Sequence, residues 1–272
     1  MLHKISFRSR GSGPILILLH GYGGSVHHWE DVAEQLSLTH QVVVPNLSHL
    51  FMSRDRLLFS VQIEILSQFI KQNFPNELVT VCGLSFGGAL AWGLAQLHPE
   101  IVDRFVMINP MVPYPLQNFK LPEVKYFLRT PISTKVLYTL LSTGIGFLFL
   151  RRAASIFRDE RAHGVARLEN LKGRKLMFVA DMIANFSWIL RNEDWGYWWK
   201  RLQFSERSSL LIYCKDDLLF SEESYLKLAE LLDCEVRQIR DAGHLASKTK
   251  PNEISEMIRE YLADTEIGKK AG

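Results

Sequence analysis

A lone serine stands between glycines in the segment Gly83–Gly88 (GLSFGG). The apolar run Leu78–Cys82 just before it predicts a buried strand, and Phe86–Leu97 just after it predicts a helix. A sharp strand-to-helix turn needs small residues two positions before and two positions after its centre, and both positions here are glycine. Such a turn would expose the hydroxyl of Ser85 above a helix N-terminus. The sequence therefore predicts Ser85 as a nucleophile.

A second glycine-rich segment, His20–Ser25 (HGYGGS), follows the apolar run Ile15–Leu19. Its glycines allow the backbone to fold close to a ligand, which makes Gly21 a candidate for contacting substrate. We expect the amide of Tyr22 to stabilise an oxyanion together with the amide of Phe86, the first residue of the helix after the serine.

A serine hydroxyl needs a base, and the chain has nine histidines. His244 alone lies in a tight loop, Asp241–His244, directly after the last predicted strand. Ligand chemistry in open parallel sheets gathers at that carboxyl edge, so His244 is predicted to be the base. His20 comes before the nucleophile, and we expect it to order its loop through hydrogen bonds.

The base in turn needs a carboxylate that holds its tautomer. The segment Cys214–Ser221 (CKDDLLFS) follows the penultimate predicted strand and offers Asp216 and Asp217. Aspartates after a strand often serve only to form a turn, and spacing alone does not choose between these two.

Strands and helices alternate along the chain and would bring these segments to one edge of a sheet. Predicted strands are Ile15–Leu19, Gln41–Pro45, Leu78–Cys82, Arg104–Asn109, Leu210–Cys214 and Glu235–Ile239, with Leu2–Phe7 as an outer strand. Predicted helices are Ser25–Leu36, Leu57–Phe74, Phe86–Leu97, Glu222–Leu232 and Pro251–Leu262, followed by a polar tail, Asp264–Gly272, that we expect to fray. Repeated strand–helix units predict an α/β fold with a mostly parallel sheet and helices on both faces.

The alternation breaks between about residues 110 and 207, where helical patterns and prolines replace buried strands. We therefore expect a core domain formed by residues 1–110 and 205–272, with residues 111–204 inserted as a helical unit.

These segments together resemble the α/β-hydrolase fold superfamily. The resemblance covers residues 2–110 and 205–262 and is carried by His20–Ser25, Gly83–Gly88, His98–Pro110, Cys214–Asp217 and Asp241–Leu262. Nucleophile, acid and histidine come in the family's order, and the insertion lies where the family places its cap. The family's strand-end pattern, Gly-x-x-Asp, implies Asp217 as the acid and a catalytic triad of Ser85, Asp217 and His244. It implies an acyl-serine route that needs no metal and no redox cofactor.

One loop departs from the family. After the second parallel strand such enzymes usually carry Asp-x-x-Gly-x-Gly-x-Ser, whereas this chain has Asn46–Ser53 (NLSHLFMS). We expect His49 and Phe51 to reshape the pocket. These two residues and Trp188, in the tryptophan-rich part of the insertion, are further candidates for contacting substrate.

Composition excludes several classes of protein. The chain has 272 residues and a formal charge of +3, which is too mild to favour nucleic acid as a partner. Three scattered cysteines form no CxxC pair and no metal-ligand spacing. The N-terminus lacks an apolar signal core, so a cytoplasmic location is expected. The apolar run Val136–Leu150 is shorter than the roughly 20 residues of a membrane span, so we expect no transmembrane segment.

The segment Arg151–Lys175 carries eight basic and three acidic residues beside that apolar run. This combination suits an acyl chain with an anionic handle: an acyl carrier protein, coenzyme A or an anionic lipid.

The expected function is that of a serine hydrolase that cleaves a carboxylic ester with an apolar acyl part. Four alternatives stay open: hydrolysis of a thioester or of an ester linked to a carrier protein or coenzyme A, acyl transfer, hydrolysis of a carbon–carbon bond, and a non-catalytic binding protein on the same fold.

Overall fold

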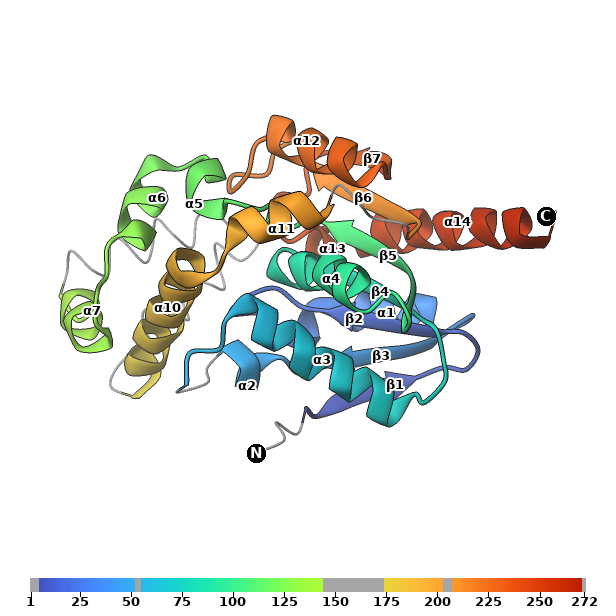
Figure 1. Cartoon of the computed structure of the whole chain (residues 1–272), viewed down its shortest axis with the longest axis horizontal. Coiled ribbons are helices and arrows are strands. Elements are labelled where there is room, and N and C mark those ends of the chain that lie inside the picture. Colours follow the sequence, from blue (N-terminus) through green and yellow to red (C-terminus); the bar gives the residue numbers. More distant parts are fainter. Residues whose placement is uncertain (1–4, 52–54, 144–173, 203–206, 271–272) are drawn as a thin grey trace.

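The computed structural model of the chain describes all residues except 1–4, 52–54, 144–173, 203–206 and 271–272. Its strands form one seven-stranded sheet in the order β1-β3-β2-β4-β5-β6-β7 (Figure 1). The strands are β1 (Phe7–Arg10), β2 (Ile15–Leu19), β3 (Gln41–Pro45), β4 (Val79–Leu84), β5 (Val102–Ile108), β6 (Ser209–Cys214) and β7 (Glu235–Ile239). The pair β1–β3 is antiparallel and the other five pairs are parallel. The predicted fold class is confirmed.

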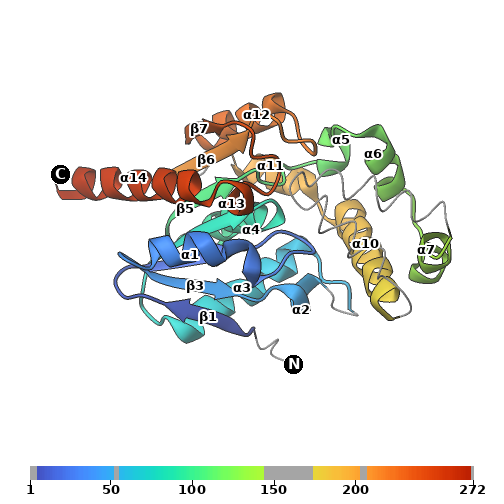
Figure 2. The ribbon, with the colours of Figure 1, turned by 180° about the vertical axis from the view of Figure 1, so that it is seen from behind.

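Helices cover both faces of this sheet. Along the chain they are η1 (Val26–Trp29), α1 (Glu30–Leu36), α2 (Ser48–Phe51), α3 (Phe59–Asn73), α4 (Phe86–Leu97), α12 (Glu222–Leu232), α13 (Ala246–Thr249) and α14 (Pro251–Lys270). Helices α3 and α4 lie on the face turned to the viewer in Figure 1, and α1 and α14 on the face seen in Figure 2.

Two hydrophobic cores result, one on each face. Strand β2 shows why: it is buried along its whole length, and its successive side chains point to opposite faces. Ile17 and Leu19 pack into the core under α3 and α4, whereas Leu16 and Leu18 pack into the core under α1 and α14. Burial on both faces explains why β2 appears in the sequence as a continuous apolar run.

Both ends of the chain differ from the predictions. The outer strand was predicted at Leu2–Phe7, part of which lies outside the described residues, but the strand observed is β1, Phe7–Arg10. All four of its residues are exposed, so no burial pattern marks its position in the sequence. The polar tail was predicted to fray from Asp264, but α14 continues to Lys270. Glu and Lys are good helix formers, so a polar segment can continue a helix.

Five of the described helices come between β5 and β6: α5 (Pro115–Asn118), α6 (Pro122–Arg129), α7 (Thr134–Leu141), α10 (Arg174–Asn192) and α11 (Trp195–Leu202). Helices α6, α7 and α10 lie beyond the sheet, on the side away from the end of α14 (Figure 1). Leu137 and Leu141 of α7 form a small core of their own with Leu176 and Ala180 of α10. Helix α11 instead returns to the sheet, where Trp198 is fully buried in the main core.

No helix within the described ranges is long and apolar enough to cross a membrane. The second half of the apolar run Val136–Leu150 lies outside these ranges, as does all but the end of the basic segment Arg151–Lys175. The partner predicted for that basic segment therefore stays a prediction.

Candidate active site

Ser85 occupies the turn between β4 and α4, and its backbone has φ 57° and ψ −118°. A non-glycine residue rarely adopts a positive φ, and such strain is held by the structure around it. The neighbouring glycines explain how the turn closes. A Cβ atom on Gly83 would lie 2.0 Å from the carbonyl oxygen of Gly87, and one on Gly87 would lie 2.2 Å from that of Leu19. No side chain fits at either position, so the backbone can turn sharply and present the serine hydroxyl.

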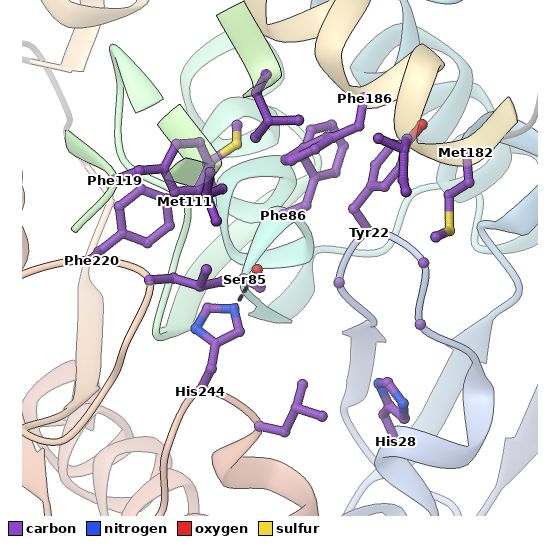
Figure 3. Close-up of a pocket in the computed structure, with 18 of the residues that line it drawn as sticks. Tyr22, His28, Ser85, Phe86, Met111, Phe119, Met182, Phe186, Phe220 and His244 are labelled. Carbon is purple, nitrogen blue, oxygen red and sulfur yellow. Dashed lines mark hydrogen bonds between the residues drawn. The ribbon is translucent and has the colours of Figure 1, made fainter. Parts of the chain in front are cut away.

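Three side chains from distant parts of the chain meet at this turn. His244, in the loop after β7, places its Nε2 2.8 Å from Oγ of Ser85. Its Nδ1 lies 2.7 Å from Oδ2 of Asp217, in the loop after β6. An ionised carboxylate can only accept, so Nδ1 donates to it, and Nε2 is left to accept a hydrogen bond from the serine hydroxyl. Figure 3 shows the bond between His244 and Ser85.

The structure also distinguishes the two aspartates. Asp217 is fully buried, with Oδ2 on His244 and Oδ1 accepting a hydrogen bond from the amide of Leu219 at 2.7 Å. Asp216 has other partners: its Oδ1 accepts from the thiol of Cys214 at 2.6 Å and from the amide of Gly243 at 3.4 Å. Of the pair, Asp217 is the carboxylate that contacts the imidazole.

Asn109 ties the two loops together, a role that the sequence analysis missed. It follows β5 with φ 41° and is fully buried. Its side-chain amide donates to the carbonyl oxygens of Gly243 and His244 at 3.0 and 2.9 Å, and its Oδ1 accepts from the amide of Cys214 at 2.7 Å. The signal available in the sequence was a polar residue directly after a buried strand, at the carboxyl edge of the sheet.

The two predicted oxyanion donors belong to chain segments that adjoin the serine. Phe86 is the first residue of α4, so its amide belongs to the first turn of the helix, where amides have no partner within the helix. Gly21 brings the other segment close, since a Cβ atom at this position would lie 3.1 Å from Cβ of Ser85. The ring of Tyr22 stacks on Phe51 at 4.7 Å, and its hydroxyl donates to the carbonyl oxygen of Phe51.

A mostly apolar cavity of about 440 Å³ opens at the serine. Figure 3 shows Phe119 and Phe220 on one side of Ser85, and His28 and Met182 on the other. The residues that line it come from the glycine-rich loop, α4, the segment after β5 with its helices, and the loop of Asp217. They include Met111, Phe119, Val124, Phe127, Leu128, Met182, Ile183, Phe186, Leu219 and Phe220. The sequence analysis named none of these ten residues.

The four candidates for contacting substrate lie in different places. Gly21 lines the cavity. Phe51 is buried behind Tyr22, and His49 is exposed on α2. Trp188 is partly buried and packs against the main core. The lining of the cavity includes Gly21 but not the other three residues.

The chain segment before α6 is joined to the loop of Asp217. Phe119 and Phe220 form an antiparallel β-bridge, and their rings stack at 4.9 Å. Next to them, the amide of Lys120 donates to the carbonyl oxygen of Leu219, and its ammonium group donates to the carbonyl oxygen of Asp217 at 2.6 Å. One side of the cavity is therefore bonded to the backbone around Asp217.

His20 orders the glycine-rich loop, as predicted from its position. It is fully buried, Nδ1 donates to the carbonyl oxygen of Gly21, and Nε2 accepts from the amide of Leu47, each at 3.0 Å. Burial lowers the pKa of His20 from 6.5 to about 4, so the ring is neutral near pH 7 and can accept that bond.

His20 should therefore make stability sensitive to acid. Its folded pKa lies below its unfolded pKa, so its contribution is fully present above pH 6.5 and is lost as the pH falls towards 4. The shift corresponds to about 3 kcal/mol. The free energy of unfolding can be measured in urea at several pH values between 7 and 4. We expect it to fall less steeply with decreasing pH in His20→Gln than in wild type. His49→Gln, at an exposed position, is the control and should follow wild type; equal slopes in all three proteins would contradict the assignment.

Within the described residues, no group of three or more His, Cys, Asp or Glu side chains could hold a metal ion.

Fold and site together define a class. A mostly parallel sheet, a serine on a strained strand–helix turn and a histidine after the last strand are the features of an α/β hydrolase. The family model described as alpha/beta hydrolase fold matches residues 14–251, and the chain belongs to that family. A putative lipase from Acinetobacter baumannii superposes with a TM-score of 0.77 at 18% identity, covering 98% of this chain and 91% of that one, which supports the fold.

Two curated relatives show how far the sequence similarity extends. A pimeloyl-[acyl-carrier protein] methyl ester esterase from Vibrio vulnificus is 30% identical over 111 residues, or 40% of this chain and 41% of the esterase. The match thus spans about two fifths of that relative's length. Methylesterase 10 from Arabidopsis thaliana is 25% identical over 263 residues, 91% of each chain.

Proposed function

We propose that this hydrolase is a serine esterase that cleaves carboxylic esters with an apolar acyl part, through an acyl-enzyme on Ser85. The observation that carries the proposal is the continuous hydrogen-bonded series from Asp217 through His244 to Ser85 at the opening of an apolar cavity. Two relatives whose names state ester hydrolysis support the same class of reaction.

In the first half-reaction, Nε2 of His244 takes the proton of the Ser85 hydroxyl, and the oxygen attacks the ester carbonyl carbon. The carbonyl electron pair moves to its oxygen, where the amides of Tyr22 and Phe86 donate to the negative charge. Asp217 stabilises the imidazolium that has formed. The carbonyl then re-forms, the bond to the leaving oxygen breaks, and His244 gives its proton to the departing alcohol.

In the second half-reaction, water replaces the alcohol. His244 takes a proton from this water as the oxygen attacks the acyl-serine, and the same two amides bind the second oxyanion. When the bond to Oγ breaks, His244 returns the proton to Ser85, and the carboxylic acid leaves. Every proton in this cycle passes through Nε2, which the hydrogen bond from Nδ1 to Asp217 keeps unprotonated in the resting site.

The cavity supports an apolar acyl group. Its walls near Phe119 and Phe220 are aromatic and aliphatic, so each buried methylene would contribute about 0.8 kcal/mol. Helices α6 and α10 supply much of this wall, which supports the proposal that residues 111–204 form a cap on a core of residues 1–110 and 205–272.

The test is a panel of p-nitrophenyl esters and thioesters of straight-chain acids of graded length. Val124 lines the cavity, so Val124→Phe should shorten the preferred acyl chain and reduce kcat/KM for the longest good substrate by about tenfold. Val136→Phe makes the same change on α7 at a side chain that is 54% exposed, and should leave the profile unchanged.

Activity that does not depend on acyl length, or the same profile in both valine variants, would contradict the proposed acyl site. A clear preference for the thioesters would instead favour a thioesterase.

A methyl ester on a carrier-linked acyl chain is the second candidate substrate, because the Vibrio vulnificus relative bears that activity in its name. The same panel tests this candidate if two methyl esters of one acid are added to it. One is the free methyl ester, and the other is the methyl ester of the same acid linked to the carrier. A higher kcat/KM for the linked form, reduced by salt, would support an anionic carrier as the partner.

A further inference from the structure

Tyr225 lies on α12, eight residues after Asp217, and is fully buried. The centre of its ring lies 5.8 Å from that of Tyr213 and 6.2 Å from that of Phe220. Its hydroxyl donates to Oδ2 of Asp217, the same oxygen that accepts from Nδ1 of His244. Tyr225 lines no part of the cavity, so it has no direct contact with a substrate there.

The carboxylate of Asp217 is thus held at both oxygens. Oδ1 accepts from the amide of Leu219, while Oδ2 accepts from Tyr225 and from His244. With Leu219 and Tyr225 fixed in a loop and a helix, the carboxylate cannot rotate about its χ2 angle without breaking one of these bonds. Its orientation towards the imidazole is set before any substrate arrives.

We infer that Tyr225 is a positioning residue for the proposed reaction: its hydroxyl fixes Oδ2 of Asp217 against Nδ1 of His244 and keeps this buried carboxylate directed at the base. The inference rests on the proposed roles of Ser85, Asp217 and His244.

Two further observations support a role as donor. A buried carboxylate needs hydrogen bonds in place of its lost hydration, and Tyr225 supplies one of three such bonds to the side chain of Asp217. Burial, and then the charge of Asp217, raise the pKa of Tyr225 well above 10, so its hydroxyl keeps the proton that it donates.

The experiment compares Tyr225→Phe with Tyr213→Phe. The control removes the same atom from the neighbouring ring, whose hydroxyl donates to Glu222 and accepts from Gln238 and does not contact Asp217. Steady-state kinetics use the best p-nitrophenyl ester, with active sites counted by fluorophosphonate labelling. We expect kcat per labelled site to fall about 10- to 100-fold in Tyr225→Phe, as for the loss of a hydrogen bond to a charged group, with KM within twofold of wild type. Both constants should stay within twofold in Tyr213→Phe.

A second readout needs no substrate. The proton on Nδ1 of His244 can be followed by NMR, and its resonance should move in Tyr225→Phe but not in Tyr213→Phe. Equal kcat values in the two variants, or an unchanged resonance in Tyr225→Phe, would overturn the inference. If wild type hydrolyses no ester, the proposed function fails, and the NMR comparison alone decides the role of Tyr225.

Discussion

Ser85→Ala is expected to abolish ester hydrolysis, with kcat lower by roughly 10⁴- to 10⁶-fold. In the proposed reaction this hydroxyl forms the acyl-enzyme, and its oxygen lies 2.8 Å from Nε2 of His244. Because alanine fits the same backbone, the free energy of unfolding should stay equal or rise slightly. The measurement is single-turnover and steady-state hydrolysis of the best ester from the panel.

A fluorophosphonate probe gives the same test without a substrate. It should label wild type and Ser37→Ala but not Ser85→Ala. Ser37 is the matched control because it lies at the other end of the parallel strands. It follows α1 and lies next to Gly11, shortly before β2 begins, whereas Ser85 lies where β4 ends. If Ser85→Ala still hydrolysed the ester at the wild-type rate, the nucleophile would be a different residue. A wild-type protein that neither labels nor hydrolyses any ester would favour the non-catalytic binding protein.

Asp217→Asn is expected to lower kcat by roughly 10⁴-fold with little change in KM. The amide that replaces the carboxylate can present an N–H group to Nδ1, which then has to accept. The ring proton moves to Nε2, and that nitrogen can no longer take the proton of Ser85. Because asparagine has nearly the shape of aspartate, the geometry of the site should stay nearly the same. The loss of kcat would then reflect the changed tautomer of His244. Steady-state kinetics on the same ester are the measurement.

The control for this substitution is the neighbouring residue. Asp216→Asn makes the same change at a carboxylate that contacts Cys214 and Gly243, and kcat should stay within about tenfold of wild type. If Asp216→Asn lowered kcat more than Asp217→Asn did, the proposed assignment of the acid to Asp217 would be wrong.

The sequence was most informative where one residue type is required by geometry. The serine turn needs glycines at two positions, because any side chain there would collide with backbone, and GLSFGG shows that requirement directly. The aspartate was harder, since both carboxylates follow the same strand; the family's strand-end pattern favoured Asp217, which is the one that contacts the imidazole.

The walls of the cavity could not be predicted in the same way. Phe119, Val124 and Met182 are ordinary apolar residues in helical segments, where packing and substrate contact leave the same pattern. Which of them face the serine depends on how the inserted helices sit on the sheet, and no short-range signal encodes that arrangement. Trp188 illustrates the difficulty: its type suggested a ligand contact, yet it packs against the main core.

The bridge between Phe119 and Phe220 couples the wall of the cavity to the loop of Asp217. Phe220 stands three residues after Asp217 in the same loop, so a mutation of Phe220 that admits a bulkier substrate should also disturb the backbone around Asp217. Val124 and Ile183 line the same cavity from helices that hold no member of the Ser85–His244–Asp217 series. New specificities should therefore arise more readily through these helices, with catalytic power retained, than through the loop.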